Sequence, residues 1–440
     1  MVDEPGSMGA FQAEANSFPR FSRFNDFTHD YAKPFRLRHL VPCEIPTSTT
    51  GCHTPPNTGK QIHLRLTDLS EYVHSQPYIA VSYTWDHAKS HKLEDGYDPL
   101  PEYYIWTGAS TYRPAKCHVE VLHRAMCFAA AKLPQPRLWI DQECIDQDNP
   151  DDLESHLQIM HKIYSESAFT VAVLSSTILA QRLVDALDIF LHWDLGTNRT
   201  PRREDFALLT LTDRKNHPVS ILGPVQRAFN YVTQDRWFRR TWTFQEKHCG
   251  SRVHFLIPVG TTVQLKRLER VGSDICLEKL FLFRRLCRWS DHSWDTTRGL
   301  ALILESHFAL PPYSPQAVLP THPQAPIKTG INSNQTFFGN IQKTHQIMET
   351  CDNLVVSDRI AIFASVNKFP ARLKSTLLNH ERYSYSTCIL VLALKNSGWF
   401  VSHPLELRPS WGLLKKTLEE TLANLEDYSK AHNWMNPDPY

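Results

Sequence analysis

The chain has 440 residues, of which 42% are hydrophobic and 21% are charged, a composition typical of a globular protein with a sizeable core. Its 47 lysines and arginines nearly balance 46 aspartates and glutamates, so net charge does not draw it to nucleic acid or an anionic membrane. No apolar run is long enough for a transmembrane helix, and the ten cysteines form no C-x-x-C pair. We therefore expect a cytoplasmic protein with reduced thiols, no membrane span and no cofactor.

The distribution of proline and phenylalanine divides the chain. Residues 1–30 carry phenylalanines among polar residues without a period, which predicts a mostly disordered segment. Residues 309–336 contain six prolines and are expected to form a linker or long loop. Between them we expect an α/β domain over residues 31–260 and a helical segment of the same domain over residues 261–308. Residues 337–440 are expected to be a mainly helical C-terminal region.

Apolar patterning predicts the first elements. We expect a first strand over residues 35–40 and, from strict alternation, a half-buried strand over residues 62–66. The near-continuous apolar run over residues 78–83 predicts a central parallel strand buried on both faces. Apolar residues at helical spacing over residues 117–133, followed by Pro134, predict a helix.

The middle of the chain predicts a βαβ unit. A short apolar strand over residues 138–140 leads into a polar turn rich in carboxylates over residues 141–147. Asn149 and Pro150 are typical of a helix N-cap and first helical residue, and a β-branched strand is predicted over residues 169–174. This order indicates a parallel sheet, and ligands of such sheets bind beyond the carboxyl ends of the strands.

The later elements follow the same rules. The predicted set is a strand over residues 253–257, helices over residues 177–193, 221–232, 266–304, 338–349, 358–366 and 411–430, and a helix or strand over residues 385–395. The expected fold is α/β, with a parallel-sheet core, helices on both faces and a mainly helical C-terminal extension.

Two polar stretches follow strands that are expected to be parallel, so their side chains should meet at one sheet edge. One strand ends with Ser82 and is followed by Trp85, Asp86 and His87. The next is followed by Asp141, Glu143, Asp146 and Gln147. These residues form a candidate ligand-binding constellation. The alternative is that the carboxylates cap helices and tie loops together, and the residues alone leave both readings open.

Residues 236–246 interleave arginines with tryptophans, a combination that suits stacked recognition of anions or planar rings. The alternative is an arginine–carboxylate network that locks this segment onto the acidic turn. A nucleic-acid interface is disfavoured because the patch is short and the chain is neutral. Histidine pairs on two predicted helices are spaced by five residues, which does not bring them onto one face, so no metal site is expected.

Four ordered blocks resemble the motifs of the fungal heterokaryon-incompatibility (HET) domain. The central block LWIDQECIDQDNPDDLESHLQIMHKIYSES is similar to the family pattern of W-I-D, C-I-[ND]-Q-x-D and a helix with Q-x-x-x-M-x-x-I-Y. The other blocks are YIAVSYTW at residues 78–85, RWFRRTWTFQE at residues 236–246 and SDRIAIFA at residues 357–364. Asp86 departs from the family, which usually has glycine there.

The resemblance implies a role in fungal non-self recognition and the triggering of cell death, and a fold distantly similar to the flavodoxin-like TIR domain. Some TIR domains cleave NAD with the glutamate of W-C-x-x-E. Trp242 and Glu246 have the same separation, which places both on one helical face. By this resemblance Glu246 is the candidate catalytic carboxylate, Trp242 a ring platform and Arg240 a phosphate contact, with Asp141 or Asp146 in support.

Two functions therefore stay open. In the first, the protein is a non-enzymatic effector that signals through self-association or a protein partner. In the second, it is a nucleosidase with NAD as its substrate, in which an ionised Glu246 stabilises the positive charge that develops on the ribose. A Glu246 buried against arginine would favour the first, and a Glu246 accessible in a cleft the second. A hydrolase built on Cys144 has no supporting local pattern.

Overall fold

In the computed structural model, the described residues are 27–29, 35–43, 61–85, 100–107, 112–192, 210–212, 218–220, 222–250, 252–278, 341, 344–345, 347–348, 351, 356–369, 371–373, 388–389, 392 and 396. The chain divides into two compact units. We call Pro34–Leu153 with Lys162–Pro311 the sheet unit, and Met1–Lys33 with Glu154–His161 and Pro312–Tyr440 the terminal unit. The predicted domain boundaries stay predictions.

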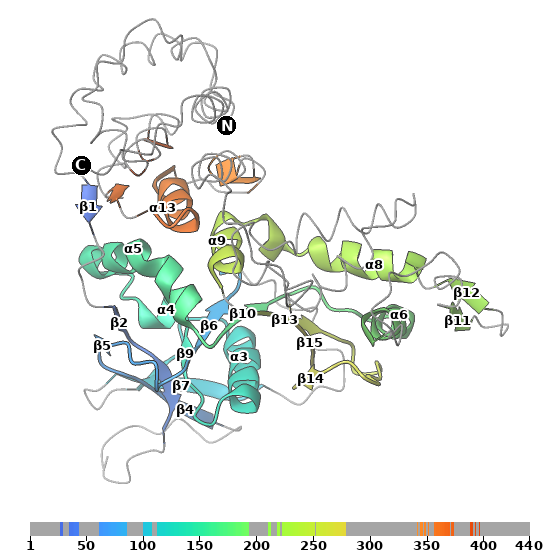
Figure 1. Cartoon of the computed structure of the whole chain (residues 1–440). Coiled ribbons are helices and arrows are strands. Elements are labelled where there is room, and N and C mark those ends of the chain that lie inside the picture. Colours follow the sequence, from blue (N-terminus) through green and yellow to red (C-terminus); the bar gives the residue numbers. More distant parts are fainter. Residues whose placement is uncertain are drawn as a thin grey trace, which may run out of the picture. The chain divides into compact units, whose positions relative to one another are not determined.

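Ten described strands of the sheet unit form one mixed sheet (Figure 1). Their spatial order is β14 (Arg270–Val271), β15 (Asp274–Glu278), β13 (Val253–Pro258), β10 (Phe169–Val173), β6 (Ile79–Ser82), β9 (Leu138–Trp139), β3 (Leu40–Pro42), β4 (Gln61–Leu66), β7 (Glu102–Trp106) and β8 (Tyr112–Pro114). Two short antiparallel pairs accompany it, β2 (Arg36–Leu37) with β5 (Ser70–Glu71) and β11 (Thr210–Thr212) with β12 (Pro218–Ser220).

The four neighbouring strands β13, β10, β6 and β9 run parallel. Along the chain their order is β6, β9, β10, β13, so the first strand has the second on one side and the third on the other. Ligands of open α/β sheets bind where the strand order reverses in this way, which here is between β6 and β10. The predicted α/β class is confirmed, whereas its flavodoxin- or TIR-like detail stays a prediction.

Helices of the sheet unit lie on both sides of the parallel strands. Figure 1 shows α3 (Val119–Lys132) on one side and α9 (Thr241–Cys249) on the other. The remaining helices are α4 (Asp141–Cys144), α6 (Gln181–His192), α8 (Leu222–Thr233), the 3-10 helix η2 (Arg236–Arg239), and α5 (Pro150–Glu166), which runs through both units. Asn149 begins α5 as predicted, because its side chain accepts the backbone N–H groups of Asp151 and Asp152 at 3.0 and 3.3 Å.

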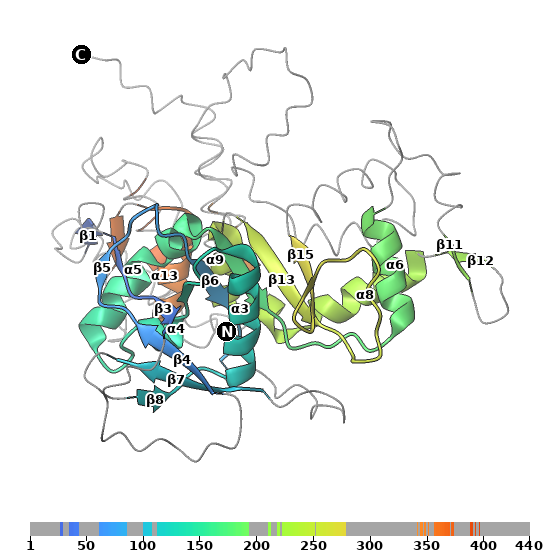
Figure 2. The same ribbon diagram turned by 90° about the horizontal axis from the view of Figure 1, so that it is seen from below.

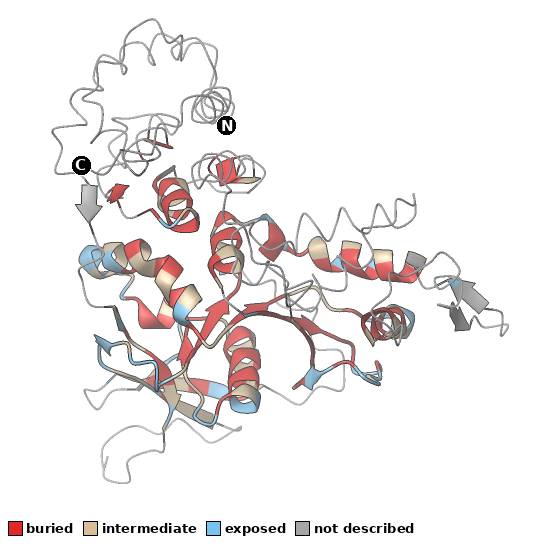
Figure 3. Ribbon diagram, in the orientation of Figure 1, coloured by how far each residue is buried: buried red, intermediate tan, exposed pale blue. Residues whose placement is uncertain are grey.

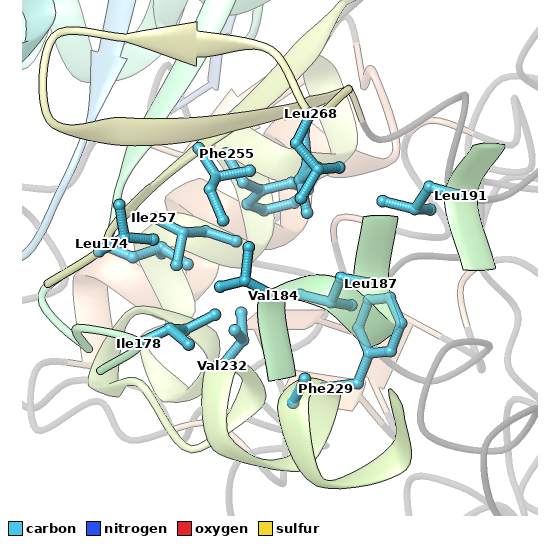
Figure 4. Packing of buried hydrophobic residues seen from close by; sticks show 14 of the residues in the cluster. Leu174, Ile178, Val184, Leu187, Leu191, Phe229, Val232, Phe255, Ile257 and Leu268 are labelled. Atoms are coloured by element: carbon cyan, nitrogen blue, oxygen red, sulfur yellow. The ribbon is translucent and has the colours of Figure 1, made fainter. Parts of the chain in front are cut away.

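A large apolar cluster fills the space between β10, β13, β15 and the helix pair α6 and α8. Figure 4 shows Leu187 of α6 and Phe229 of α8 facing one another beside Val232, and Figure 2 shows the two helices packed together. The parallel strands are buried along their length, while exposed residues gather on the outer loops (Figure 3). Trp139 and Ile140 are fully buried, as predicted.

The predicted helix over residues 266–304 is wrong in its described part. Residues 270–278 form the hairpin of β14 and β15, and residues 279–304 lie outside the described residues. Gly272 takes a left-handed φ of 60° at the turn, a conformation that glycine adopts without steric cost. Because β15 pairs with β13 over five residues, tertiary pairing overrides the helical spacing of the apolar residues.

Two further boundaries differ. The polar turn that was expected after Trp139 begins with the short helix α4, whose first turn contains Asp141 and Glu143, where acidic side chains favour a helix. The helix predicted from residue 177 begins at Gln181 because Ile178 first forms a parallel bridge with Val259.

The terminal unit contains α13 (Val356–Val366) and a short antiparallel pair of β1 (Phe27–His29) with β16 (Ala371–Leu373). Residues 27–29 therefore form a strand, against the expectation of disorder over residues 1–30, of which the rest lies outside the described residues. The described residues within 341–348 and 388–392 are helical. The proline-rich stretch 309–336 and the predicted helix over 411–430 also lie outside them. Among the described residues, none of the helices is long and apolar enough to cross a membrane.

Candidate functional site

Asp141 is the centre of one cluster at the carboxyl edge of the parallel strands. Its Oδ2 accepts a hydrogen bond from Trp85 Nε1 at 2.7 Å, and its Oδ1 accepts one from the Tyr83 hydroxyl at 2.8 Å. The backbone N–H of Gln142 adds a third, also at 2.8 Å. Asp141 is half-buried, whereas the Trp85 ring is 49% exposed. The carboxylate therefore fixes an aromatic ring that faces solvent.

Glu246 is the centre of a second cluster and is only 8% exposed. Its Oε2 accepts a hydrogen bond from the hydroxyl of Ser82, the last residue of β6, and the Tyr164 hydroxyl also hydrogen-bonds to its carboxyl group. Ser82 in turn accepts a hydrogen bond from Trp237 Nε1 at 2.7 Å. An ordered chain of donors thus runs from a buried indole through a buried hydroxyl to the glutamate.

The two carboxyl groups interact electrostatically. Burial raises the pKa of Glu246 to about 7, against the opposing effect of the hydrogen bond from Ser82, and the negative charge of Asp141 raises it further. Burial also raises the pKa of Asp141, although its bonds from Trp85 and Tyr83 favour the ionised form. The guanidinium of Arg240 lowers both pKa values. A pKa of about 7 places the protonation equilibrium of Glu246 near neutral pH.

Asp235 ties the segment that carries Trp237 to the loop after β10. Its Oδ2 accepts the backbone N–H groups of Ser175 and Ser176, each at 2.7 Å, and the Ser175 hydroxyl at 3.0 Å. Its Oδ1 accepts the N–H of Trp237 at 2.9 Å, which caps η2. This buried carboxylate therefore positions Trp237, and through it the hydroxyl of Ser82.

Other members of the acidic turn are structural. Glu143 is buried, pairs with Arg113 at 2.7 Å and accepts the backbone N–H groups of Lys116 and Cys117 at 2.5 and 2.9 Å. Asp146 is exposed, and its Oδ1 accepts a long bond of 3.4 Å from the N–H of Asp148. For these two carboxylates, the contacts fit the alternative hypothesis that carboxylates of the acidic turn tie loops together.

The predicted constellation is brought together in part. Trp85, Asp141, Arg240 and Glu246 converge as expected. Gln147 lies beneath them, where its side chain donates to the Asp141 carbonyl oxygen at 3.2 Å. Trp242 is half-buried in the first turn of α9. Asp86 lies outside the described residues.

Two alternative chemistries gain no support. Cys144 is buried, and burial raises the pKa of its thiol to about 12, so the thiolate that a nucleophile needs does not form near neutral pH. Within the described part of the chain, no group of three or more His, Cys, Asp or Glu side chains is placed to hold a metal ion.

Sequence analysis missed three participants. Tyr83 and Tyr164 lie in apolar runs and were counted as core, but each hydroxyl reaches a carboxylate. Asp235 directly precedes the arginine–tryptophan segment, and an aspartate in that place is a signal for a helix cap that could have been recognised.

The fold and the site define an α/β protein in which a half-buried aspartate and a buried glutamate interact at the carboxyl edge of the parallel strands. Residues 78–246, which contain the whole site, match the family model described as heterokaryon incompatibility protein (HET). This part of the chain is therefore similar to the HET domain. The match ends at Glu246, and the blocks at residues 78–85, 138–167 and 236–246 all lie within it.

A curated relative from Neurospora crassa, heterokaryon incompatibility protein 6, OR allele, is 28% identical over 193 residues. The alignment covers 38% of this chain and 27% of that protein, so the chain spans only about a quarter of the relative's length. No solved structure matches this chain. The comparisons associate the domain with heterokaryon incompatibility in fungi.

Proposed function

We propose that the protein is a heterokaryon-incompatibility effector that takes part in fungal non-self recognition and triggers cell death from the cytoplasm. In this proposal it acts as a signalling or assembly module, through a protein partner or self-association. The family match and the incompatibility relative support the biological role.

The enclosed position of Glu246 is the observation that favours a module over an enzyme. Its carboxyl group is 8% exposed and already hydrogen-bonded by Ser82 and Tyr164. A group held in this way links β6, α5 and α9 and leaves little surface for a substrate. The exposed ring of Trp85, held by Asp141, is in contrast suited to contact with a protein, because tryptophan is enriched among the residues that dominate interfaces.

Inducible expression in a filamentous fungus tests this proposal. We expect the parent chain to kill the cells and Trp85→Ala to lose this effect, because the substitution removes the exposed ring. Tyr231→Ala is a matched control, since Tyr231 is a similarly exposed aromatic residue on α8, at 41%. A parent chain that leaves cells viable would refute the effector role, and equal loss in both variants would refute the role of Trp85.

NAD cleavage is the second candidate, and the raised pKa of Glu246 favours it, because strongly perturbed carboxyl groups gather at functional sites. Water would attack the ribose C1′ while the C1′–N bond breaks. Nicotinamide would leave with the electron pair, and the attacking water would release one proton to solvent. An ionised Glu246 would stabilise the cationic ribose, Trp242 would stack the leaving ring, and Arg240 would contact phosphate.

This candidate predicts a pH profile. Only the ionised form of Glu246 can stabilise the cationic ribose. The rate of nicotinamide release by purified, concentrated protein should therefore rise as the pH passes through about 7, the pKa of that group. Glu246→Gln should abolish release, and Glu246→Asp should keep a trace. Glu102→Gln, which changes an exposed carboxylate on β7, should have no effect. Absence of release from the parent at every pH would remove the enzyme candidate and leave the effector proposal standing.

A further inference from the structure

A second concave site lies at the opposite end of the parallel strands. It is an open groove of about 370 Å³, within the size range of ligand sites, lined by Phe35, Glu71, Tyr72, His74, Lys162 and Glu166. Tyr72 packs edge-on against Tyr78, which directly precedes β6, with ring centroids 5.5 Å apart. The groove is therefore at the amino ends of the strands, away from the edge that carries Asp141 and Glu246.

Aromatic rings form one side of this groove. The ring of Tyr72 meets that of Phe35 at 5.3 Å with an interplanar angle of 64°, and that of His74 at 5.0 Å with an angle of 76°. The Tyr72 hydroxyl donates to the Glu166 carbonyl oxygen at 3.0 Å, which fixes the central ring. The faces of aromatic rings attract cations, and this ring cluster lines one side of the groove.

Carboxylates outnumber cations among the lining side chains. Glu71 and Glu166 are both exposed, and Lys162 is the single lysine or arginine of the described lining. Glu166 Oε2 lies 3.9 Å from His74 Nδ1, so one carboxylate is directly beside the aromatic side. A negative rim next to aromatic faces complements a cationic group and disfavours an anion.

The surroundings suit a polypeptide better than a small molecule. Leu69 and Val73, two residues to either side of Glu71, are exposed at 41% and 50%. They offer apolar contacts to the neighbours of a bound side chain. Four of the six lining residues precede residue 78, where the HET family match begins. The groove is thus built largely by sequence outside the matched region.

We propose that this groove binds an arginine or lysine side chain of a partner polypeptide, with apolar neighbours of that side chain on Leu69 and Val73. The aromatic side holds the cation, and Glu71 and Glu166 neutralise it. The site is separate from the carboxyl pair, so binding here does not depend on the effector proposal.

Saturation-transfer NMR on the full chain tests the side-chain chemistry. The probes are the N-acetyl amides of arginine and of citrulline, which has nearly the same shape without the charge. We expect the arginine probe to bind and the citrulline probe to bind at least fivefold more weakly, because two exposed ion pairs contribute on the order of fivefold in affinity. Equal binding of the two probes, or no binding of arginine, overturns the proposal.

Charge variants test the location. The double variant Glu71→Gln/Glu166→Gln should weaken arginine binding about fivefold, whereas Lys162→Gln should strengthen it, because the substitution removes a like charge from the lining. Glu102→Gln serves as the matched control, and melting temperatures confirm that each variant is folded. Unchanged affinity in the double variant, or weaker binding by Lys162→Gln, overturns the assignment.

A pair of tripeptides tests the polypeptide source. Acetyl-Leu-Arg-Val-amide should bind more tightly than acetyl-Gly-Arg-Gly-amide, and the double variant Leu69→Ser/Val73→Ser should abolish this difference while still binding the glycine peptide. If the two peptides bind equally to the parent chain, a small organic cation and not a polypeptide is the ligand class, and the proposed partner is wrong.

Discussion

Glu246→Gln should change the stability of the protein in a direction that depends on pH. The substitution keeps the shape of the side chain and an oxygen that can accept the Ser82 hydrogen bond, but it removes the ionisable proton. Burial favours the protonated form of Glu246 in the folded state, where its pKa is about 7 instead of the ordinary 4.5. In the parent chain, the folded protein therefore binds a proton more tightly than the unfolded chain does.

The magnitude follows from proton linkage. A carboxyl group whose pKa is higher in the folded protein than in the unfolded chain stabilises the folded state fully below pH 4.5. This stabilisation is lost as the pH rises to about 7. Between pH 5 and pH 8 this loss is on the order of 2–3 kcal/mol for the two pKa values involved. Glutamine does not titrate, so the parent loses this amount and the variant does not. An opposing, pH-independent cost of about 1–3 kcal/mol is expected, because the amide cannot accept from both Ser82 and Tyr164 as a carboxylate does.

Urea unfolding of the full chain at pH 5 and pH 8, followed by tryptophan fluorescence, measures this effect. Between pH 5 and pH 8, the free energy of unfolding of the variant relative to that of the parent should rise by about 2–3 kcal/mol. Glu102→Gln, which changes an exposed carboxylate on β7, is the matched control variant. If the difference for Glu246→Gln is insensitive to pH, the carboxyl group does not titrate as its burial requires, and the coupled pair is refuted.

Further substitutions probe the same scaffold. Trp139→Ala, at a fully buried site, should lower stability by about 3–5 kcal/mol, and an unchanged urea midpoint would contradict the βαβ core. Asp235→Asn should cost about 1–3 kcal/mol for each buried donor it leaves without a partner, whereas the exposed control Asp148→Asn should stay within about 0.5 kcal/mol. Trp85→Phe should raise the pKa of Asp141 in a carboxyl NMR titration, because it removes a hydrogen bond that favours the ionised form; an unchanged pKa would show that the bond is absent.

The parallel strands and α5 could be predicted because their sequence patterns agree with the burial and the helix start that the folded protein shows. The apolar run of β6 is buried on both faces, and Asn149 and Pro150 mark the start of α5 both in the sequence and in the structure. Once two strands are parallel, the residues after them share an edge, which is why Trp85 and Asp141 were expected together and lie 2.7 Å apart at their bonded atoms.

The remainder depends on contacts that no local pattern encodes. The hairpin of β14 and β15 carries apolar residues at spacings that a helix would also use, and only pairing with β13 selects the strand. The partners of Glu246 come from β6 and α5, which are 164 and 82 residues earlier in the chain at Ser82 and Tyr164. Its high pKa results from burial, and burial is a property of the whole fold.

The pair of Asp141 and Glu246 connects an exposed aromatic ring to the buried core. Asp141 holds the exposed ring of Trp85, while Glu246 holds buried Ser82, and the negative charge of Asp141 raises the pKa of Glu246. Because Arg240 lowers the pKa of both, any partner that displaces this guanidinium would favour uptake of a proton by the pair. By linkage, proton uptake would then favour that partner. Displacement of Arg240 would thus be coupled to the protonation of the two carboxyl groups.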